Sequence, residues 1–273
     1  PAHLKDMGAF GVKAVTVFRN NPSGFSLPST LATIIMLDQE TGKALSIMDG
    51  GYITAMRTGA VSGLATKYMA RADVSVAGVL GMGVQARTQV LGMCSVRPIQ
   101  KVLCFAVDPP EQQQAFADEM SQRLGILIEM TKSVQEVVEQ ADILALATTS
   151  HDPIVSGEWL RPGTHINSVG SHTPTARELD TASVTRSKVV CDLTAACMAE
   201  AGDLLLPIQE GTFSQDKVFA ELGDVVTGRK KGRENDQEIT LFKSVGLSVQ
   251  DIATAHLVYQ KALEQGVGTN FDF

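Results

Sequence analysis

The stretch AGVLGMGVQARTQV, residues 77–90, constrains the fold of this chain more than any other feature. It overlaps VSVAGVL (74–80), a continuous apolar and β-branched run that is typical of a strand covered on both faces, and it continues into a helical pattern. Two glycines in a turn are a weak signal by themselves. Between a buried strand and a helix, however, Gly81 permits the tight turn and Gly83 lets a pyrophosphate approach the backbone at the helix N-terminus. We therefore predict a dinucleotide-binding unit rather than a bare structural turn.

Strand and helix patterns alternate at short spacing after this turn. Such alternation is typical of a parallel sheet with helices on both faces. We expect an α/β protein with a Rossmann-type, doubly wound parallel sheet. The strand patterns lie at 101–107, 126–130, 142–148, 164–170 and 187–193, and the helical patterns at 84–94, 110–125 and 133–141.

The predicted cofactor contacts follow from this unit. The usual acidic partner of the ribose is expected about 20 residues after the glycines, at the end of the second strand. Asp108 is the nearest acid there, and no arginine stands beside it to hold a 2′-phosphate. NAD is therefore favoured, and NADP stays open. Besides the two glycines, we assign cofactor contacts to the first residues of the helix, Val84, Gln85, Ala86 and Arg87, of which Ala86 also supplies the third small residue for helix packing.

Composition argues against several classes of protein. A formal net charge of -7 argues against a general nucleic-acid binder, because binding to phosphates needs a basic surface. No apolar run approaches the roughly 20 residues of a transmembrane helix, and the opening stretch PAHLKDMGAF lacks the basic start and apolar core of a secretory signal. The four cysteines and five histidines show no metal-binding spacing. We expect a cytoplasmic protein that binds neither nucleic acid, membrane nor metal.

Two cationic residues lie in patterned segments before this unit. Lys13 lies in GAFGVKAVTVF (8–18), an apolar strand pattern, so its ammonium must reach solvent, find a partner or work in a cleft. Arg57 precedes a group of small residues in GGYITAMRTGAVSGLATKYMAR (50–71), a predicted helix that another backbone or a ligand can approach closely. The planar fork of arginine suits a carboxylate. The alternatives are an edge-strand lysine and an ordinary surface arginine.

Five segments together resemble the ornithine cyclodeaminase and mu-crystallin family, in the same order from about Gly11 to the C-terminus. The family includes ornithine cyclodeaminase, an alanine dehydrogenase and reductases of cyclic or open-chain imines. The segments are GVKAVTVF, LDQETGKALSIMDGGYITAMRTGAVSGLATKYMAR, GVLGMGVQAR, GTHINSVGSHTPTARELD and EITLFKSVGLSVQDIATA.

The resemblance implies roles for single residues. Lys13 would hold the substrate α-carboxylate or lie beside the reacting carbon, and Arg57 would bind the same carboxylate. Asp203, in AEAGDLLLP, would act as acid or base, although without the resemblance a helix-capping role is the simpler interpretation. Further contacts to the nicotinamide cofactor would come from Ser29, Thr148, Thr149, Ser150 and Ser244.

The function that we expect is hydride transfer between a nicotinamide and the α-carbon of a small amino acid or its imine. Fixed cations on the carboxylate would turn that carbon toward the ring. An NAD(P)-dependent dehydrogenase or imine reductase is favoured, because EAGDLLLPI and FAELGDVVTG look closer to the mu-crystallin side of the family. Ornithine cyclodeaminase, which converts ornithine to proline plus ammonia with bound NAD, is one alternative. A non-catalytic crystallin-like binding protein is the other, and the joint presence of Lys13, Arg57 and Asp203 argues against it.

The order of the segments predicts two domains. Residues 67–245 would form the dinucleotide-binding domain, and residues 1–66 with 246–273 would form a smaller α+β domain for substrate binding and dimerisation. A predicted helix at 248–266 has an apolar face that needs a partner, and the resemblance implies a homodimer. Family members usually begin several tens of residues earlier, with a segment that adds substrate contacts, so the identity of the amino acid or imine stays open.

Overall fold

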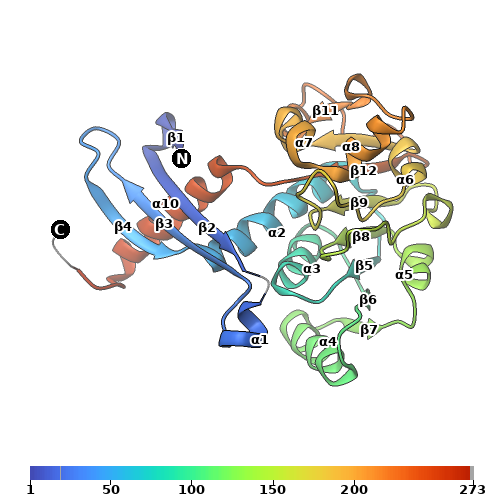
Figure 1. Ribbon diagram of the computed structural model, residues 1–273, viewed down its shortest axis with the longest axis horizontal. Coiled ribbons are helices and arrows are strands. Elements are labelled where there is room, and N and C mark those ends of the chain that lie inside the picture. Colours follow the sequence, from blue (N-terminus) through green and yellow to red (C-terminus); the bar gives the residue numbers. More distant parts are fainter. Residues whose placement is uncertain (19, 271–273) are drawn as a thin grey trace. The chain divides into compact units, whose positions relative to one another are not determined.

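The chain divides by its internal contacts into two units. The computed structural model describes residues 1–18 and 20–270. Unit 1 contains both chain ends, up to Arg57 and from Gly246 onward, and unit 2 contains Thr58–Val245. Helix α2 (Gly50–Met69) supplies residues to both units. Each unit has its own sheet and is described by itself, with the labels of Figure 1.

Unit 2 is built on a parallel sheet of eight strands. They are β5 (Val76–Leu80), β6 (Lys101–Phe105), β7 (Leu127–Met130), β8 (Ile143–Leu146), β9 (His165–Ser168), β10 (Ser187–Cys191), β11 (Ala220–Glu221) and β12 (Ile239–Lys243). Their order is β11-β10-β12-β9-β8-β5-β6-β7, and every pairing is parallel. The predicted α/β class with a Rossmann-type sheet is confirmed.

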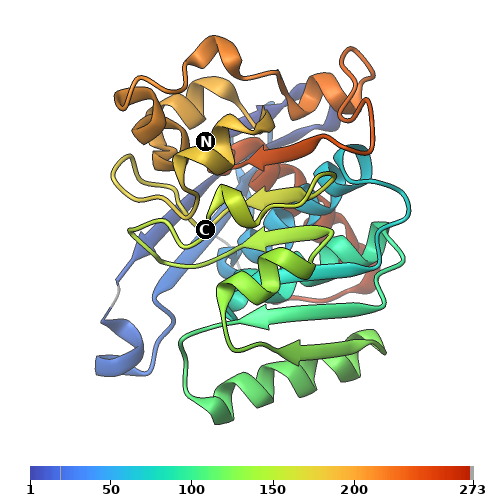
Figure 2. The ribbon, with the colours of Figure 1, turned by 90° about the vertical axis from the view of Figure 1, so that its right-hand side faces the viewer.

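Helices cover both faces of this sheet (Figure 2). They are α3 (Val84–Val96), α4 (Pro110–Leu124), α5 (Val134–Gln140), α6 (Thr181–Thr185), α7 (Thr194–Glu200), α8 (Gly202–Gln209) and α9 (Leu222–Val226), with short 3-10 turns η2 (Gly157–Trp159) and η3 (Gln215–Lys217). Successive side chains of a strand point to opposite faces, so Val79 clusters with residues of α3 and α4, whereas Leu80 clusters with residues of α5 and α8. A third cluster joins α2 and α9 to Phe242 of β12.

Local signals in the sequence explain where several of these helices begin and end. Pro110 opens α4, where its missing N–H costs nothing. Gly125 ends the same helix with φ of 69°, a left-handed conformation that glycine adopts without strain. The Ser133 side chain accepts a hydrogen bond from the Glu136 N–H and so caps α5.

Helices α2 and α3 cross at close range, because both carry glycine at the crossing. A Cβ atom added to Gly63 would lie 2.7 Å from the Gly92 carbonyl oxygen, and one added to Gly59 would collide with the Thr88 carbonyl oxygen. The small residues of α2 therefore accommodate another backbone, and this decides between the two possibilities that the sequence left open. The crossing holds α2 against the helix that follows the glycine-rich turn.

Unit 1 is built on an antiparallel sheet with the order β1-β2-β3-β4. Its elements are β1 (Ala2–Leu4), η1 (Lys5–Met7), β2 (Ala9–Val17), α1 (Asn21–Phe25), β3 (Thr30–Leu37), β4 (Ala44–Asp49) and α10 (Ser248–Gln265). Helix α10 packs on one face of the sheet, where Ile252 and Ala255 join Ile34, Met36 and Ile53 in a buried cluster. The C-terminal helix thus completes the core of the N-terminal segment.

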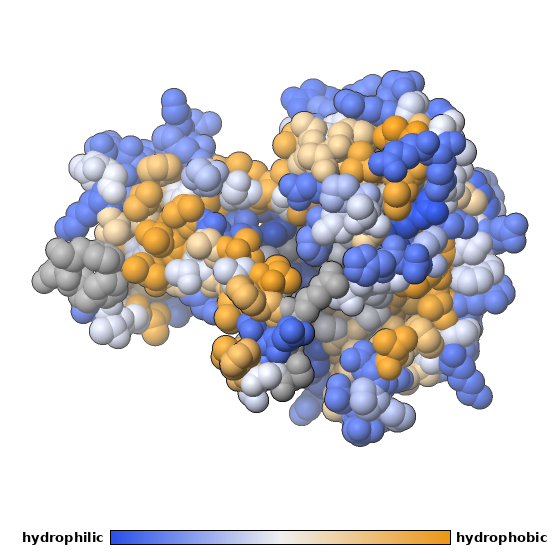
Figure 3. Space-filling model, in the orientation of Figure 1, coloured by the Kyte–Doolittle hydropathy of each residue, from blue (hydrophilic) through white to orange (hydrophobic). Residues whose placement is uncertain are grey.

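The opposite face of this antiparallel sheet carries exposed apolar side chains. Leu31, Leu45 and Ile47 are 40%, 38% and 45% exposed, and the register places Ile35 opposite Ile47. Figure 3 shows hydrophobic side chains over the strands of unit 1. Exposed apolar side chains that share one sheet face are typical of a surface that binds another protein.

The crossing of α2 and α3 predicts an unusual response to a glycine-to-alanine change. In an isolated helix Gly63→Ala would stabilise by about 1 kcal/mol. Here we expect the free energy of unfolding to fall by about 1–3 kcal/mol, because the new methyl group overpacks the contact with Gly92. Urea unfolding measures the change. Ala60→Ser, at an exposed position of the same helix, is the control, and a stabilised Gly63→Ala variant would contradict the close crossing.

Candidate active site

A cavity of about 430 Å³ lies in unit 2 at the carboxyl ends of β5, β6 and β8. The chain runs outward from β5 to β6 and β7 and then returns to β8 on the other side of β5. At such a switch point the loops that follow neighbouring strands diverge, and ligands of open α/β sheets bind there. Predicted cofactor residues that line the cavity are Gly81, Gly83, Asp108, Thr148, Thr149 and Ser150.

Glycine suits the two positions of the turn, Gly81 and Gly83, for different structural reasons. Gly81 has φ of 94°, and a Cβ atom there would lie 2.6 Å from the Ala147 carbonyl oxygen. Gly83 has no heavy atom within 4 Å of such a Cβ position among the described residues, so its side of the turn is open. An open backbone at a helix N-terminus fits the close approach of a pyrophosphate.

The first turn of α3 supplies unsatisfied backbone donors. Val84, Gln85 and Ala86 follow the N-cap Gly83, which makes no side-chain cap hydrogen bond. Their N–H groups have no acceptor within the helix. Gln85 also has a buried Oε1 atom without a hydrogen-bond partner in the described part of the chain, and Ala86 is fully buried. The free N–H groups fit the phosphate of a ligand, and the contacts of all three residues to a cofactor stay a prediction.

Arg87 holds the glycine-rich turn through contacts with the protein itself. Its guanidinium donates to the Met82 carbonyl oxygen at 2.6 Å and pairs with Glu119 at 2.7 Å. It also lies over the Phe116 ring, 5.0 Å from the centroid. The guanidinium is therefore largely occupied, and the predicted contact of Arg87 with the cofactor has no further support from this geometry.

Ser29 and Ser244 lie outside the lining of the cavity. Ser244 is 4% exposed, and its hydroxyl donates to Asp192 Oδ2 at 2.7 Å. Ser29 belongs to unit 1, where its carbonyl oxygen accepts a hydrogen bond from the Phe18 N–H. Contact of either side chain with the cofactor also stays a prediction.

Lys13 and Arg57 share one carboxylate within unit 1. Lys13 Nζ on β2 lies 2.7 Å from Asp251 Oδ2, and Arg57 Nε on α2 lies 2.9 Å from Asp251 Oδ1. Asp251 belongs to the first turn of α10. Of the outcomes that the sequence left open for Lys13, the structure shows a paired ammonium, which also donates to the Thr54 hydroxyl at 3.3 Å.

Burial and charge act on Lys13 in opposite directions. Burial lowers the pKa of its ammonium, the hydrogen bond and charge of Asp251 raise it, and the positive charge of Arg57 lowers it further. The net shift is downward, since burial is the largest effect. Lys13 is thus a stronger acid than a free lysine.

The backbone around Arg57 is shaped to take its guanidinium. Gly246 has φ of 86°, and a Cβ atom there would lie 2.8 Å from Arg57 Nη1. Arg57 Nη1 also donates to Gln250 Oε1 at 3.0 Å. Arg57 is 8% exposed, so it is a buried and fixed arginine rather than an ordinary surface one.

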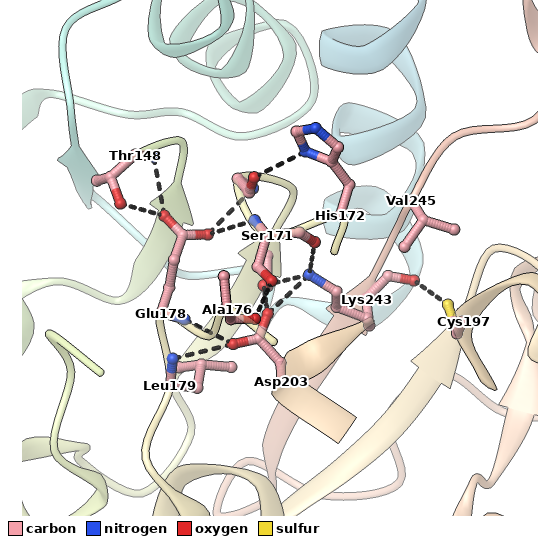
Figure 4. A network of polar contacts seen from close by, with 12 residues as sticks. Thr148, Ser171, His172, Ala176, Glu178, Leu179, Cys197, Asp203, Lys243 and Val245 are labelled. Carbon is pink, nitrogen blue, oxygen red and sulfur yellow. Dashed lines mark hydrogen bonds and ion pairs between the residues drawn. The ribbon is translucent and has the colours of Figure 1, made fainter. Parts of the chain in front are cut away.

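Asp203 is fully buried in unit 2, in the network of Figure 4. Its Oδ2 lies 2.7 Å from Lys243 Nζ and accepts a hydrogen bond from the Ser168 hydroxyl at 2.9 Å. Its Oδ1 accepts from the N–H groups of Glu178 and Leu179 at 2.7 and 3.0 Å. Asp203 does not cap its own helix α8. The acid or base role suggested by the resemblance stays a prediction.

Three charged residues of these clusters were missed by the sequence analysis. Asp251 looks like a first-turn acid of an amphipathic helix, and nothing local ties it to Lys13. Lys243 had a usable signal, because a lysine at the end of the apolar strand ITLFK must find a partner if the strand is buried on both faces. Glu178 lies in a loop before α6, and its burial depends on contacts far along the chain.

The described residues contain neither a metal-binding cluster nor a membrane-spanning helix. Within residues 1–18 and 20–270, no group of three or more His, Cys, Asp or Glu side chains is arranged to hold a metal ion. No helix in those ranges combines the length and apolar character needed to cross a bilayer.

Comparison with known proteins gives consistent likenesses over the whole chain. A Delta(1)-pyrroline-2-carboxylate reductase of Bacillus cereus is 40% identical over 275 aligned positions, which cover 100% of this chain and 83% of the relative. The structure of the Thermococcus litoralis Delta(1)-pyrroline-2-carboxylate reductase, in complex with NADH and L-proline, matches with a TM-score of 0.96 and 50% identity, covering 98% of this chain and 83% of that one. An archaeal alanine dehydrogenase dimer with bound NAD matches with a TM-score of 0.93 and 36% identity, covering 100% and 83%. The model of the ornithine cyclodeaminase/mu-crystallin family matches residues 1–266, and the chain belongs to this family.

Proposed function

We propose that this chain is an NAD-dependent oxidoreductase that reduces the C=N bond of a small α-imino acid, such as the cyclic pyrroline-2-carboxylate, to the corresponding amino acid. The observation that carries the proposal is 50% identity with the Thermococcus litoralis reductase, whose structure holds NADH and L-proline. The chain's own residues support it. Unit 2 offers a glycine-rich turn that fits a dinucleotide, and unit 1 offers paired cations that fit a carboxylate.

The charge balance of the unit 1 cluster suits one substrate carboxylate. Lys13 and Arg57 carry two positive charges, and Asp251 carries one negative charge. One positive charge is left uncompensated, which favours an anion of single charge. Asp251 and Gln250 also fix the guanidinium of Arg57, so the carboxylate meets a donor whose orientation is already set.

Reduction of the imine needs a hydride at carbon and a proton at nitrogen. When bound, NADH supplies the hydride. We assign the proton to Lys13, because burial has lowered the pKa of its ammonium. Asp203 is the second proposed acid or base. Asp203 is fully buried, as are Ser168 and Lys243, whose polar atoms contact its Oδ2, so this role requires a proton relay that continues beyond these two residues.

Asp108 supports NAD rather than NADP. It lines the cavity at the end of β6, where the ribose of a dinucleotide is expected. A carboxylate there hydrogen-bonds a ribose 2′-hydroxyl and repels a 2′-phosphate. The cavity lining also lacks lysine and arginine among the described residues.

We also propose that the chain forms a homodimer through the apolar face of the antiparallel sheet. The exposed side chains of Leu31, Leu45 and Ile47 supply an apolar patch. The archaeal alanine dehydrogenase that matches over the full chain is described as a dimer. A second copy of the same face is self-complementary in a two-fold arrangement.

A paired assay tests the proposed reaction. We expect NADH to be consumed with pyrroline-2-carboxylate, and L-proline to reduce NAD in the reverse direction, both followed at the absorbance of NADH. Ornithine with catalytic NAD should give no proline. Formation of proline and ammonia from ornithine without net change in NADH would favour the cyclodeaminase alternative instead. NADH binding without turnover of imines or amino acids would favour the binding protein.

Removal of Lys13 tests its contact with the substrate. Lys13→Ala should raise the KM for the imino acid by about ten- to a hundredfold, the effect of one lost charge-assisted contact. In Asp251→Asn, Lys13 loses the carboxylate that raises its pKa. Because only the protonated ammonium holds a carboxylate, the rise in KM at alkaline pH should then begin at lower pH than in the wild type. Initial rates across pH measure both effects.

The control for these variants is Lys43→Ala, which removes an exposed lysine of the same unit. It should leave KM and its pH profile unchanged. An unchanged KM in Lys13→Ala would remove Lys13 from the substrate site, and an unchanged pH profile in Asp251→Asn would show that Lys13 does not control the alkaline limb.

A charged side chain on the apolar sheet face tests the dimer. Ile47→Glu should convert the dimer to a monomer, because it places a charge in a surface that must lose water on association. Light scattering measures the mass. Lys261→Glu, at an exposed position of α10, should remain dimeric. An active wild-type monomer would remove the proposal.

A further inference from the structure

Glu178 is a fully buried carboxylate that joins two loops at the carboxyl edge of the parallel sheet (Figure 4). Its Oε1 accepts hydrogen bonds from the Thr148 N–H at 2.8 Å and the Thr148 hydroxyl at 2.7 Å. Its Oε2 accepts from the N–H groups of Gly170 and Ser171 at 3.0 and 3.2 Å. One side chain therefore ties the loop after β8 to the loop after β9.

The contact with Thr148 continues to the wall of the cofactor cavity. Thr148, Thr149 and Ser150 line that cavity, whereas Glu178 does not. The Thr148 hydroxyl oxygen accepts a hydrogen bond from the Ser150 N–H at 3.2 Å. The segment has no regular secondary structure, so side-chain bonds to its backbone are what fix its conformation.

Contacts with Asp203 and Gly170 fix the position of Glu178 itself. Its own N–H donates to Asp203, which pairs with Lys243. A Cβ atom added to Gly170 would collide with the Glu178 carboxylate, so glycine at that position makes room for it. These contacts fix the position of the Glu178 carboxylate, and the carboxylate in turn fixes the two loops that donate hydrogen bonds to it.

We propose that Glu178 is a positioning residue that holds the cavity wall at Thr148, Thr149 and Ser150 and thereby sets the affinity for NAD(H) without touching the cofactor. The inference rests on the proposed function in one respect, that this cavity takes NAD(H). It adds a residue outside the cavity on which cofactor binding depends.

Ionisation decides whether Glu178 can hold the wall. Only the carboxylate accepts all four hydrogen bonds, because a protonated carboxyl group must direct its own O–H toward a neighbour. Burial raises the pKa of Glu178 to about 7; the charge of Asp203 raises it too, whereas Lys243 and the Thr148 donors lower it. His172 is another titratable group beside these loops, with Nδ1 3.1 Å from the Gly170 carbonyl oxygen. Affinity for NADH should therefore fall as pH falls through about 7.

The test is fluorescence titration with NADH at several pH values. Wild-type protein should bind NADH about fivefold more weakly at pH 6 than at pH 8, because roughly nine in ten Glu178 side chains are protonated at the lower pH and then bind as weakly as the Glu178→Gln variant. Glu178→Gln should bind about tenfold more weakly than wild type at pH 8, as expected for one or two lost hydrogen bonds. Its affinity should change little between the two pH values. Glu178→Asp, which keeps the charge but shortens the reach, should bind weakly and retain a pH dependence.

Two control variants separate Glu178 from its surroundings. His172→Asn removes the histidine beside the loops and should keep the pH dependence of the wild type. Glu158→Gln changes an exposed glutamate of the same unit and should match the wild type throughout. Wild-type affinity for NADH in a folded Glu178→Gln protein overturns the inference, as does a pH dependence that disappears in His172→Asn. If Glu178→Gln does not fold, a flat wild-type profile or wild-type affinity in Glu178→Asp overturns it. Failure of the wild type to bind NADH at pH 8 is a different result, which removes the proposed function instead.

Discussion

The ion pair between Lys243 and Asp203 is the constraint on which the carboxyl edge of the parallel sheet depends. Both side chains are 0% exposed, and two charges without access to water are tolerated only when their remaining hydrogen-bonding capacity is filled. Lys243 fills it with the Ser168 hydroxyl and the Ser171 carbonyl oxygen. Asp203 fills it with the same hydroxyl and with two backbone N–H groups, one of them from Glu178. The pair thus fixes β9, β12, α8 and the loop between β9 and α6 to one another.

The ion pair also orders two loops that have no regular secondary structure. The loop between β9 and α6 carries Glu178, and Glu178 in turn fixes the loop after β8. A pocket wall made of loop backbone has few apolar contacts to define it, so its order comes from polar bonds to buried charges. The polar network therefore supports the wall of the cofactor cavity in unit 2.

The sequence predicted the parallel sheet well because its signals are local. Each signal acts within a few residues: a buried β-branched run indicated β5, Gly81 and Gly83 indicated the turn before α3, and Ser133 indicated the start of α5. The structure confirms these three elements. The charged clusters were not predictable in this way. Asp251 lies about 240 residues after Lys13, and only the packing of α10 on β2 brings them together. The resemblance to a known family gave Lys13, Arg57 and Asp203, but not the partners that define their charge.

Charge balance distinguishes the two clusters physically. In unit 1, two cations face one carboxylate, and the Lys13 side chain is still 12% exposed. Its surplus positive charge can attract an anion from solvent, so it suits a binding role. In unit 2, one cation faces two carboxylates that are fully buried. That surplus negative charge has no access to a cation, and only hydrogen bonds or a proton can relieve it. Burial and, after it, the charge of Asp203 raise the pKa of Glu178 to about 7. The surplus positive charge of the unit 1 cluster, which is open to solvent, thus supports binding of an anion. The surplus negative charge of the unit 2 cluster, which is closed off from solvent, makes the positioning residue Glu178 sensitive to pH.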